Sequence, residues 1–238
     1  MIASRGGWRS LLDVLAAVAM IAASVAVISW SISTRQGTSA RPMTSKPQVA
    51  TPAAPVSLQG AALKGSPAAK VAVIEYSDFQ CPFCARFARE TLPQVRKRYV
   101  DTGQLLVAFK HLPLERLHPL AMRAAQAAEC AGRGGKFWEM HDKLFENQIG
   151  TDQDALLRSG GAIGLDLSTL VACLQGQPDA KIGQDIEEAK ALAIRGAPTF
   201  MFGTVQSDGR VKITKVVSGA LSIDEFANIV DPLLRPGR

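Results

Sequence analysis

Two cysteines stand where a predicted strand passes into a predicted helix, and this placement constrains the fold more than any other feature of the sequence. Residues 71–76 form a short, mostly β-branched and apolar run that is typical of a buried strand. Residues 86–100 carry apolar side chains at roughly helical spacing. Cys81 and Cys84 therefore lie at a helix N-terminus, where unpaired N–H groups and the helix dipole favour a negative charge. Because the thiolate is the reactive form of cysteine, Cys81 is predicted to be redox-active.

The spacing of the two cysteines also admits zinc binding. A CxxC pair can be half of a zinc site when a second pair, or two histidines at a set spacing, supplies the other ligands. The sequence has no second CxxC and no HxxxH, so redox chemistry is favoured and no metal site is predicted. Pro82 suits the first helical turn, where its fixed φ fits the helix and its missing N–H is not needed.

Length and composition indicate a globular chain. With 238 residues, of which 47% are hydrophobic and 20% charged, the sequence has room for one good-sized domain. The formal net charge is +6, but the basic residues are scattered and belong to no recognisable nucleic-acid-binding module. We therefore interpret the charge as a solvated surface and predict no nucleic-acid partner.

The first 30 residues contain a long apolar segment. Its uninterrupted part, residues 14–30, is about as long as the shortest bilayer-spanning helices and exceeds the roughly 7–15 residues of a signal-peptide core. We interpret residues 1–30 as a membrane anchor, and a signal peptide cleaved after Ala40 is the alternative. Positive charges on the two sides roughly balance, so they do not determine the orientation.

The segment after the anchor separates it from the folded domain. Residues 31–57 are rich in Ser, Thr, Pro and Ala and show no periodicity, which predicts a disordered tether. The folded domain is expected to occupy residues 58–238. All four cysteines lie in that domain, and an even number is compatible with an oxidising compartment, so we place the domain on the extracytoplasmic side.

The remaining pattern predicts a split α/β sheet interrupted by helices. A second strand, residues 104–110, follows the cysteine helix, in which Pro93 is expected to cause a kink or break. Two later strands precede a closing helix that begins with a capping box at Ser222. Between the two halves, about 80 residues (115–194) form a helical insertion. The expected helices of the insertion are residues 120–131, 137–145, 154–158, 168–174 and 179–194, and the later strands are residues 196–202 and 210–217.

This pattern resembles the thioredoxin superfamily and, within it, the DsbA-like thiol–disulfide oxidoreductases. The resemblance covers roughly residues 71–234 and includes the helical insertion. It rests on two motifs, Tyr76-Ser77-Asp78-Phe79-Gln80-Cys81-Pro82-Phe83-Cys84 and Gly196-Ala197-Pro198-Thr199. It implies a thioredoxin fold, made of βαβ and ββα halves, with an inserted helical domain. It also implies that Cys81 is the nucleophile, Cys84 the resolving cysteine and Pro198 a cis-proline that faces the disulfide.

The same resemblance implies where a substrate binds. A cis-proline at position 198 would aim the backbone edge of Ala197 at the active site, where an extended peptide can pair with it. Pro82 and Phe83, between the cysteines, complete the predicted substrate-binding residues. A trans proline at the start of a strand is the alternative for Pro198. The strongest oxidants of the family carry histidine where this chain has Phe83, which leaves the degree of oxidising power open.

Glu75 occupies the place of the buried acid that, in the family, helps proton transfer to the resolving thiol. A carboxylate on an apolar strand is destabilising unless it is paired, and burial tends to raise its pKa into a range useful for acid–base chemistry. Lys110, at the end of the next predicted strand, is a candidate partner. The alternative is that Glu75 is a strand-end acid that reaches water.

Cys130 and Cys173 both fall in the helical insertion, where some relatives of DsbA carry a second disulfide. The resemblance therefore implies a structural bridge, which would close a loop of about 43 residues. Two buried free thiols are the alternative. The three histidines are dispersed in the sequence, and their spacing does not favour a metal cluster with the cysteines.

These features predict a membrane-tethered, extracytoplasmic enzyme that introduces disulfide bonds into exported proteins. By resemblance, it would sit in a bacterial inner membrane with its catalytic domain in the periplasm, or be soluble there if the first segment is cleaved. Its expected partners are exported proteins with free cysteines and a DsbB-like or VKOR-like membrane reoxidant, and no cofactor is needed beyond the cysteines. The alternatives are a disulfide reductase or isomerase of the same superfamily, and a redox-silent peptide-binding chaperone.

Overall fold

The structure is a computed structural model, and it describes residues 49–148, 152–176 and 179–235. The predicted anchor, residues 1–30, and most of the predicted linker, residues 31–57, lie outside these described residues. Within the described ranges, no helix is both long and apolar enough to cross a bilayer.

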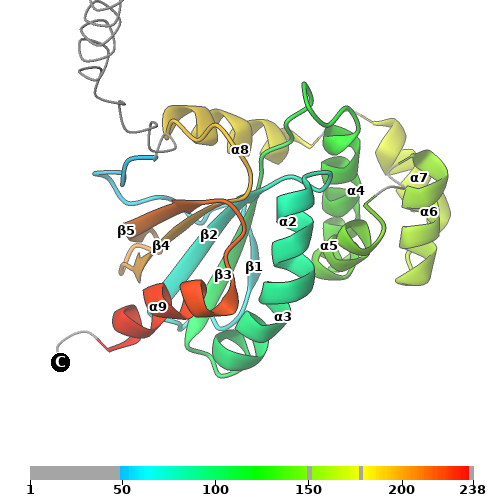
Figure 1. Ribbon diagram of the computed structural model, residues 1–238. Helices are drawn as coiled ribbons and strands as arrows, with labels where there is room; N and C mark the ends of the chain where they lie inside the picture. Colours follow the sequence, from blue (N-terminus) through cyan, green and yellow to red (C-terminus); the bar gives the residue numbers. More distant parts are fainter. Residues whose placement is uncertain (1–48, 149–151, 177–178, 236–238) are drawn as a thin grey trace, which may run out of the picture. The chain divides into compact units, whose positions relative to one another are not determined.

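The described residues form one five-stranded sheet (Figure 1). Its strands are β1 (Ala62–Lys64), β2 (Val71–Ser77), β3 (Leu105–His111), β4 (Thr199–Val205) and β5 (Val211–Ser218). Their order across the sheet is β1-β3-β2-β4-β5, with β2 and β3 parallel and the other neighbours antiparallel. Every residue of β2 and β3 is buried, because helices cover both faces of the sheet.

A helical crossover joins β2 to β3, as a parallel pair requires. Its parts are α2 (Pro82–Arg86), a π-helical segment (Phe87–Thr91), α3 (Leu92–Val95) and a second π-helical segment (Arg96–Val100). α3 begins directly after the first π-helical segment, and Pro93 is its second residue. The helix is therefore irregular beside Pro93, as its missing N–H predicts.

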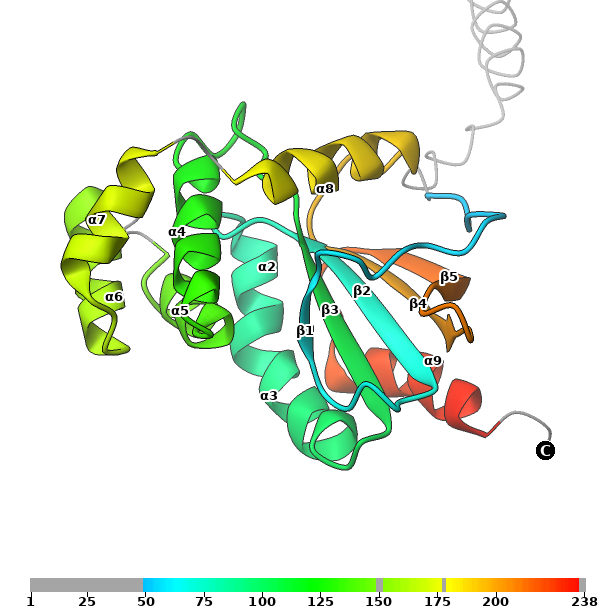
Figure 2. The ribbon, with the colours of Figure 1, turned by 180° about the vertical axis from the view of Figure 1, so that it is seen from behind.

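The helical insertion lies between β3 and β4. Its helices within the described residues are α4 (Ala121–Arg133), α5 (Phe137–Glu146), α6 (Gln153–Ala162), α7 (Leu167–Gln175) and α8 (Ala180–Ala191). The first four gather beside α2, whereas α8 crosses the opposite face of the sheet (Figures 1 and 2). α8 ends before the predicted residue 194, because Ala193 has a left-handed backbone with φ of 56° that an α-helix cannot contain.

Two apolar layers hold the sheet between its helices. On one face, Phe87 of the crossover packs against Phe200 of β4 and Phe226 of α9 (Ile223–Leu234). On the other face, β2 contributes Ile74 to a second cluster that includes Ala189 of α8. Because the strands are buried on both faces, polar functional side chains are expected at the strand ends and in the loops that follow.

The last 40 residues of the chain, 199–238, contain a hairpin and a capped helix. A bulge interrupts the pairing of β4 with β5 between residues 202 and 203, and a Cβ at Gly203 would lie 2.1 Å from the Lys212 carbonyl oxygen. α9 begins with the predicted capping box, in which the Ser222 hydroxyl accepts from the Glu225 N–H and the Glu225 carboxylate accepts from the Ser222 N–H. β1 was not predicted from the sequence, because three residues are too few to show alternation.

Candidate active site

The two cysteines occupy the junction between β2 and α2. Cys81 is the N-cap residue of α2, and its extended backbone (φ −72°, ψ 122°) turns the loop into the helix. Pro82 takes the first helical position. Cys81 keeps 4% of its surface accessible and Cys84 none, whereas Phe83 is 53% exposed between them. Cys81 is therefore the sulfur that an incoming thiol can approach.

The loop before β4 brings a second segment against the cysteine pair. The Ala197–Pro198 peptide bond is cis. The Cys81 Sγ donates to the Ala197 carbonyl oxygen at 3.3 Å, across 116 residues of sequence. The structure thus places Cys81, Ala197 and Pro198 together, with Pro82 and Phe83 at the start of the adjacent helix.

The two thiols have opposite acidities. A hydrogen bond from the Cys84 side chain, together with the Cys84 and Phe83 N–H groups, lowers the pKa of Cys81 to about 6 against the opposing effects of burial and of the Asp78 charge. Burial, followed by the Cys81 interaction, raises the pKa of Cys84. At neutral pH the negative charge of the reduced pair therefore resides on Cys81.

Glu75 lies beneath the pair and does not reach solvent. Its residue is 1% exposed, and neither carboxyl oxygen accepts a hydrogen bond of normal geometry from the described residues. Burial raises the pKa of Glu75 to about 7, against a lowering effect of the Ser77 hydroxyl. The charge of Glu75 in turn contributes to the raised pKa of Cys84, which shows that the two groups interact.

The predicted pairing of Glu75 with Lys110 is wrong. Across the parallel strands Glu75 is the partner of Phe109, whereas Tyr76 is the partner of Lys110. Because successive side chains of a strand alternate between faces, Lys110 projects to the other side of the sheet. There its Nζ forms an ion pair with Glu188 of α8.

Asp78 ties the cysteine loop to the segment before α4, a role the sequence reasoning missed. Its Oδ1 accepts from the Gln80 N–H at 2.7 Å. Its Oδ2 accepts from the Leu114 N–H and from His118 Nδ1, each at 2.8 Å. An Asp whose side chain accepts from the N–H two residues on is a local turn signal. The His118 contact joins residues that are 40 positions apart, and no sequence pattern predicts it.

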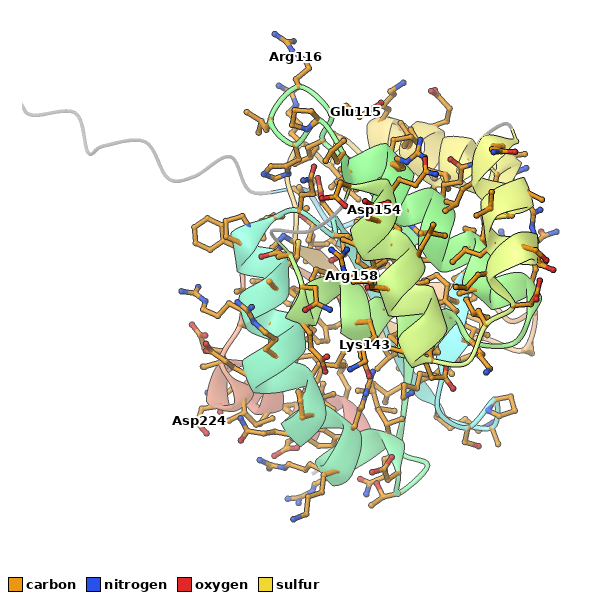
Figure 3. All side chains as sticks on the ribbon, turned by 90° about the vertical axis from the view of Figure 1, so that its right-hand side faces the viewer. Glu115, Arg116, Lys143, Asp154, Arg158 and Asp224 are labelled. Atoms are coloured by element: carbon orange, nitrogen blue, oxygen red, sulfur yellow. A yellow bond between two sulfur atoms is a disulfide. The ribbon has the colours of Figure 1, made fainter. Side chains whose placement is uncertain are left out.

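A groove opens on the insertion side of the active site. It has a volume of about 800 Å³ and lies between the cysteine helix, the end of α5 and α6. Figure 3 shows Lys143 and Arg158 in this region, on neighbouring helices. The charged residues that line the groove are Arg89, Lys143, Glu146 and Arg158. Gln148, also in the lining, donates to the carbonyl oxygens of Phe79 at 3.0 Å and Cys81 at 2.7 Å. This basic groove therefore extends to the cysteine loop.

The other two cysteines form a bridge within the insertion. Cys130 of α4 and Cys173 of α7 are joined by a disulfide that closes a separation of 43 residues. Next to it, the Gln126 side chain donates to the Cys173 and Gly176 carbonyl oxygens, each at 3.1 Å. The bridge holds helices of the insertion together. In the described part of the chain, no group of three or more His, Cys, Asp or Glu side chains could hold a metal ion.

Comparison with known proteins identifies the family. A family model described as Thioredoxin matches residues 58–230. Among solved structures, alpha-DsbA1 of Wolbachia pipientis aligns with a TM-score of 0.67 and 24% identity, over 75% of this chain and 93% of that chain. DsbA2 of Pseudomonas aeruginosa aligns with a TM-score of 0.56 and 27% identity, over 71% of this chain and 91% of that chain.

A longer protein also contains a similar stretch. The Na(+)/H(+) antiporter NhaA 3 of Salinispora tropica is 35% identical over 161 residues, which are 67% of this chain. This chain spans about a quarter (24%) of the length of that antiporter. The similarity therefore concerns one part of the larger protein.

The fold and the cysteine pair together define a DsbA-like thiol–disulfide oxidoreductase, with helices inserted between the two halves of an α/β thioredoxin fold. The chain belongs to the thioredoxin family.

Proposed function

We propose that this chain introduces disulfide bonds into exported proteins through Cys81 and Cys84. The observation that carries the proposal is the unequal acidity of the two thiols, with the pKa of Cys81 lowered to about 6 and that of Cys84 raised. A thiolate of low pKa is a good leaving group, so a mixed disulfide between Cys81 and a substrate resolves readily toward the substrate disulfide. The asymmetry therefore favours donation of the disulfide over its retention.

The reaction begins with the Cys81–Cys84 disulfide. A substrate thiolate attacks Cys81 Sγ and forms a mixed disulfide, while the bond to Cys84 breaks and Cys84 leaves with the electron pair and takes up a proton. A second substrate thiolate then attacks the substrate sulfur of the mixed disulfide, and Cys81 leaves as a thiolate. The substrate has lost two electrons, which the reduced cysteine pair now holds.

Glu75 is the proposed proton donor and acceptor for Cys84. With a pKa of about 7, it can exist in both protonation states near neutral pH. It gives a proton to Cys84 when Cys84 leaves, and it takes the proton back when Cys84 attacks during reoxidation. Its burial next to Cys84 supports this role, because no exposed acid could reach a thiol with no accessible surface.

The backbone of Ala197 is the proposed docking edge for an extended substrate segment, with Pro198, Pro82 and Phe83 beside it. The 3.3 Å contact between Cys81 Sγ and the Ala197 carbonyl oxygen supports this assignment, because a peptide paired with residue 197 lies next to the reactive sulfur. The exposed ring of Phe83 offers apolar surface to a partially folded client.

We further propose that the domain works in a bacterial periplasm, tethered to the inner membrane through residues 1–30 or free there if that segment is cleaved. The Cys130–Cys173 disulfide supports an oxidising compartment. The proposed clients are exported proteins with free cysteines. The proposed reoxidant is a DsbB-like or VKOR-like membrane protein that regenerates the Cys81–Cys84 disulfide.

Trapping of mixed disulfides in cells tests the proposal. In Cys84→Ala, a partner attached to Cys81 cannot be released by the resolving thiol, so it should accumulate. The matched control Cys81→Ala should capture none. Capture of exported proteins together with a quinone-linked membrane protein supports the proposal, and capture of a thioredoxin-driven electron donor alone indicates a reductase or isomerase.

The reduction potential of the purified pair separates the remaining alternatives. A disulfide donor should be clearly more oxidising than thioredoxin, whose potential is about −270 mV. A value near that of thioredoxin contradicts the proposal. Peptide binding and assembly activity that survive Cys81→Ala unchanged indicate a redox-silent chaperone instead.

A further inference from the structure

Among the described residues, a group of buried polar atoms without a hydrogen-bond partner lies beneath the active site. They are both carboxyl oxygens of Glu75, the hydroxyl of Ser77 and Nδ1 of His111. Each of these three residues is 1% exposed. Unpaired polar atoms in a protein interior are destabilising and are normally few, so their concentration at one place indicates a function.

Strand register places the three side chains on one face of the sheet. Glu75 and Ser77 are two residues apart on β2, and Ser77 is the direct partner of His111 on β3. Cys84 lies next to the same group. Burial has the largest effect on the pKa of Cys84, but the Glu75 charge also raises this pKa and the Ser77 hydroxyl lowers it. Ser77 is therefore the neighbour of Glu75 along β2 and of His111 across to β3, on one face of the sheet, and its hydroxyl makes no hydrogen bond with the described residues in the structure as it stands.

His111 connects this buried group to the surface. Its Nε2 lies 2.7 Å from Glu129 Oε1 on α4, and the same oxygen lies 2.8 Å from Lys181 Nζ on α8. The side chains of Glu129 and Lys181 are 14% and 16% exposed, so they reach solvent. Polar side chains thus follow one another from Cys84 to the outside, hydrogen-bonded from His111 to Lys181 and joined by strand register from Ser77 to His111.

The protonation states in this sequence suit proton transfer. Burial lowers the pKa of His111, which favours a neutral imidazole. Burial raises the pKa of Glu129, but its bonds to His111 and Lys181 outweigh that effect and lower it, which favours a carboxylate. A carboxylate accepts, so the imidazole donates from Nε2 and leaves Nδ1 as an acceptor on the side of the ring away from Glu129.

On the basis of the proposed function, we propose that His111 and Glu129 conduct protons between Glu75 and solvent, with Ser77 as the link. During reoxidation, Cys84 gives its proton to Glu75 as its sulfur attacks Cys81 and displaces the reoxidant thiolate. The Ser77 side chain then turns to bring its hydroxyl to His111, and the Glu75 carboxyl protonates the Ser77 oxygen while the Ser77 proton moves to His111 Nδ1. At the same time the His111 Nε2 proton moves to the Glu129 carboxylate, from which water takes it.

The same path runs inward during substrate oxidation and supplies the proton that the leaving Cys84 thiolate takes up. One proton enters and one leaves in each catalytic cycle, so the histidine alternates between its two neutral tautomers and returns to its starting form. No group in the path gains or loses a proton over the full cycle. The path needs no oxidant or reductant beyond those of the proposed function.

The surroundings of His111 leave few competing routes. The rings of Phe79, Phe109 and Phe137 pack around the imidazole with centroid distances of 6.1, 5.3 and 5.9 Å. The charged groups that act on it are Glu129 on α4 and Lys181 and Asp185 on α8, and Glu75 lies on the same face of the sheet, two residues from its strand partner Ser77. Asp185 accepts the His111 backbone N–H at 2.9 Å and so holds the strand end in place.

The test is the rate at which Cys84 resolves a mixed disulfide. The reduced full-length protein reacts with excess oxidised glutathione, and release of glutathione from Cys81 is followed by stopped flow from about pH 6 to about pH 9. His111→Phe keeps an aromatic ring in the cluster but removes both nitrogens. Glu129→Gln keeps an acceptor for Nε2 but takes up a proton poorly. The matched control is His141→Phe, since His141 packs on the same Phe109 ring but pairs with Asp142.

His111→Phe and Glu129→Gln should each slow the Cys84 step near neutral pH by about tenfold or more, because the proton exchange that supports general acid–base transfer by Glu75 is impaired. Alkylation of Cys81 should be unchanged, and His141→Phe should stay within about twofold of the wild-type rate. Wild-type rates in both relay variants at every pH would overturn the proposal, as would equal slowing of the Cys81 and Cys84 steps, which indicates a structural role. If His111→Phe does not fold, Glu129→Gln decides. A wild-type protein that exchanges no disulfide contradicts the proposed function itself.

Discussion

Replacement of Glu75 by glutamine should make the protein more stable, but only where the native acid is ionised. Unfolded Glu75 releases its proton near pH 4.5, whereas native Glu75 holds it to about pH 7 because burial disfavours the charge. The native state therefore binds more protons throughout this window. The stability associated with the protonated acid is fully present below pH 4.5, falls as the pH rises, and is lost above about pH 7.

The magnitude follows from the two pKa values. At about 1.4 kcal/mol per pH unit, the interval from 4.5 to about 7 corresponds to about 3 kcal/mol. The isosteric amide does not ionise. Apart from a constant offset, the free energy of unfolding of Glu75→Gln should therefore equal that of wild type near pH 4.5. Above pH 7 it should exceed the wild-type value by about 3 kcal/mol. For a domain of this size that gain corresponds to a Tm higher by roughly 6–12 °C.

Urea unfolding at a series of pH values measures this difference, with the cysteine pair kept reduced in both proteins. The matched control is Glu115→Gln, because Glu115 lies on an exposed loop (Figure 3) and should change little at any pH. A difference between Glu75→Gln and wild type that stays constant from acid to alkaline pH would refute the reasoning. It would mean that the acid is not desolvated in the native state.

Three further predictions concern the site and its scaffold. Asp78→Asn should lower the pKa of Cys81 below about 6, because the Asp78 charge opposes formation of the thiolate. A pH titration followed by the ultraviolet absorbance of the thiolate measures this pKa, and a raised value would contradict the prediction. Loss of the Cys130–Cys173 bridge should destabilise the protein by about 3–4 kcal/mol, as expected for a closed loop of 43 residues, and an unchanged urea midpoint in the double serine variant would argue otherwise. Gly203→Ala should be destabilising by at least about 1 kcal/mol, because its Cβ would meet backbone 2.1 Å away, and a Tm equal to wild type would disprove the clash.

The strand–cysteine–helix junction could be predicted from the sequence because each part has a local cause. A β-branched run forms a strand, a proline starts a helix, and a cysteine between them meets the helix dipole. The capping box at Ser222 and the irregularity beside Pro93 were predictable for the same reason. The split sheet with its helical insertion followed from the order of such elements, and the DsbA-like fold followed from the resemblance carried by the two motifs at residues 76–84 and 196–199.

The partners of buried groups could not be predicted in this way. Lys110 lies on β3, the strand next to the one that carries Glu75. Its side chain projects from the other face of the sheet, because the register of β2 on β3 pairs Glu75 with Phe109. One residue of register decides which side chains meet. The contact of His118 with Asp78 depends likewise on how a loop folds back over the sheet.

The sequence by itself determined most of the elements and the position of the reactive thiol, since helix starts, strand runs and the CxxC spacing act over a few residues. Tertiary structure alone decided the burial that raises the pKa of Cys84, the isolation of Glu75 and the path from Ser77 to Glu129. Those properties depend on burial and on the alignment of strands and helices that are distant in the chain. Electrostatic energies change steeply with distance and with exclusion of water, so only the packed fold determines them.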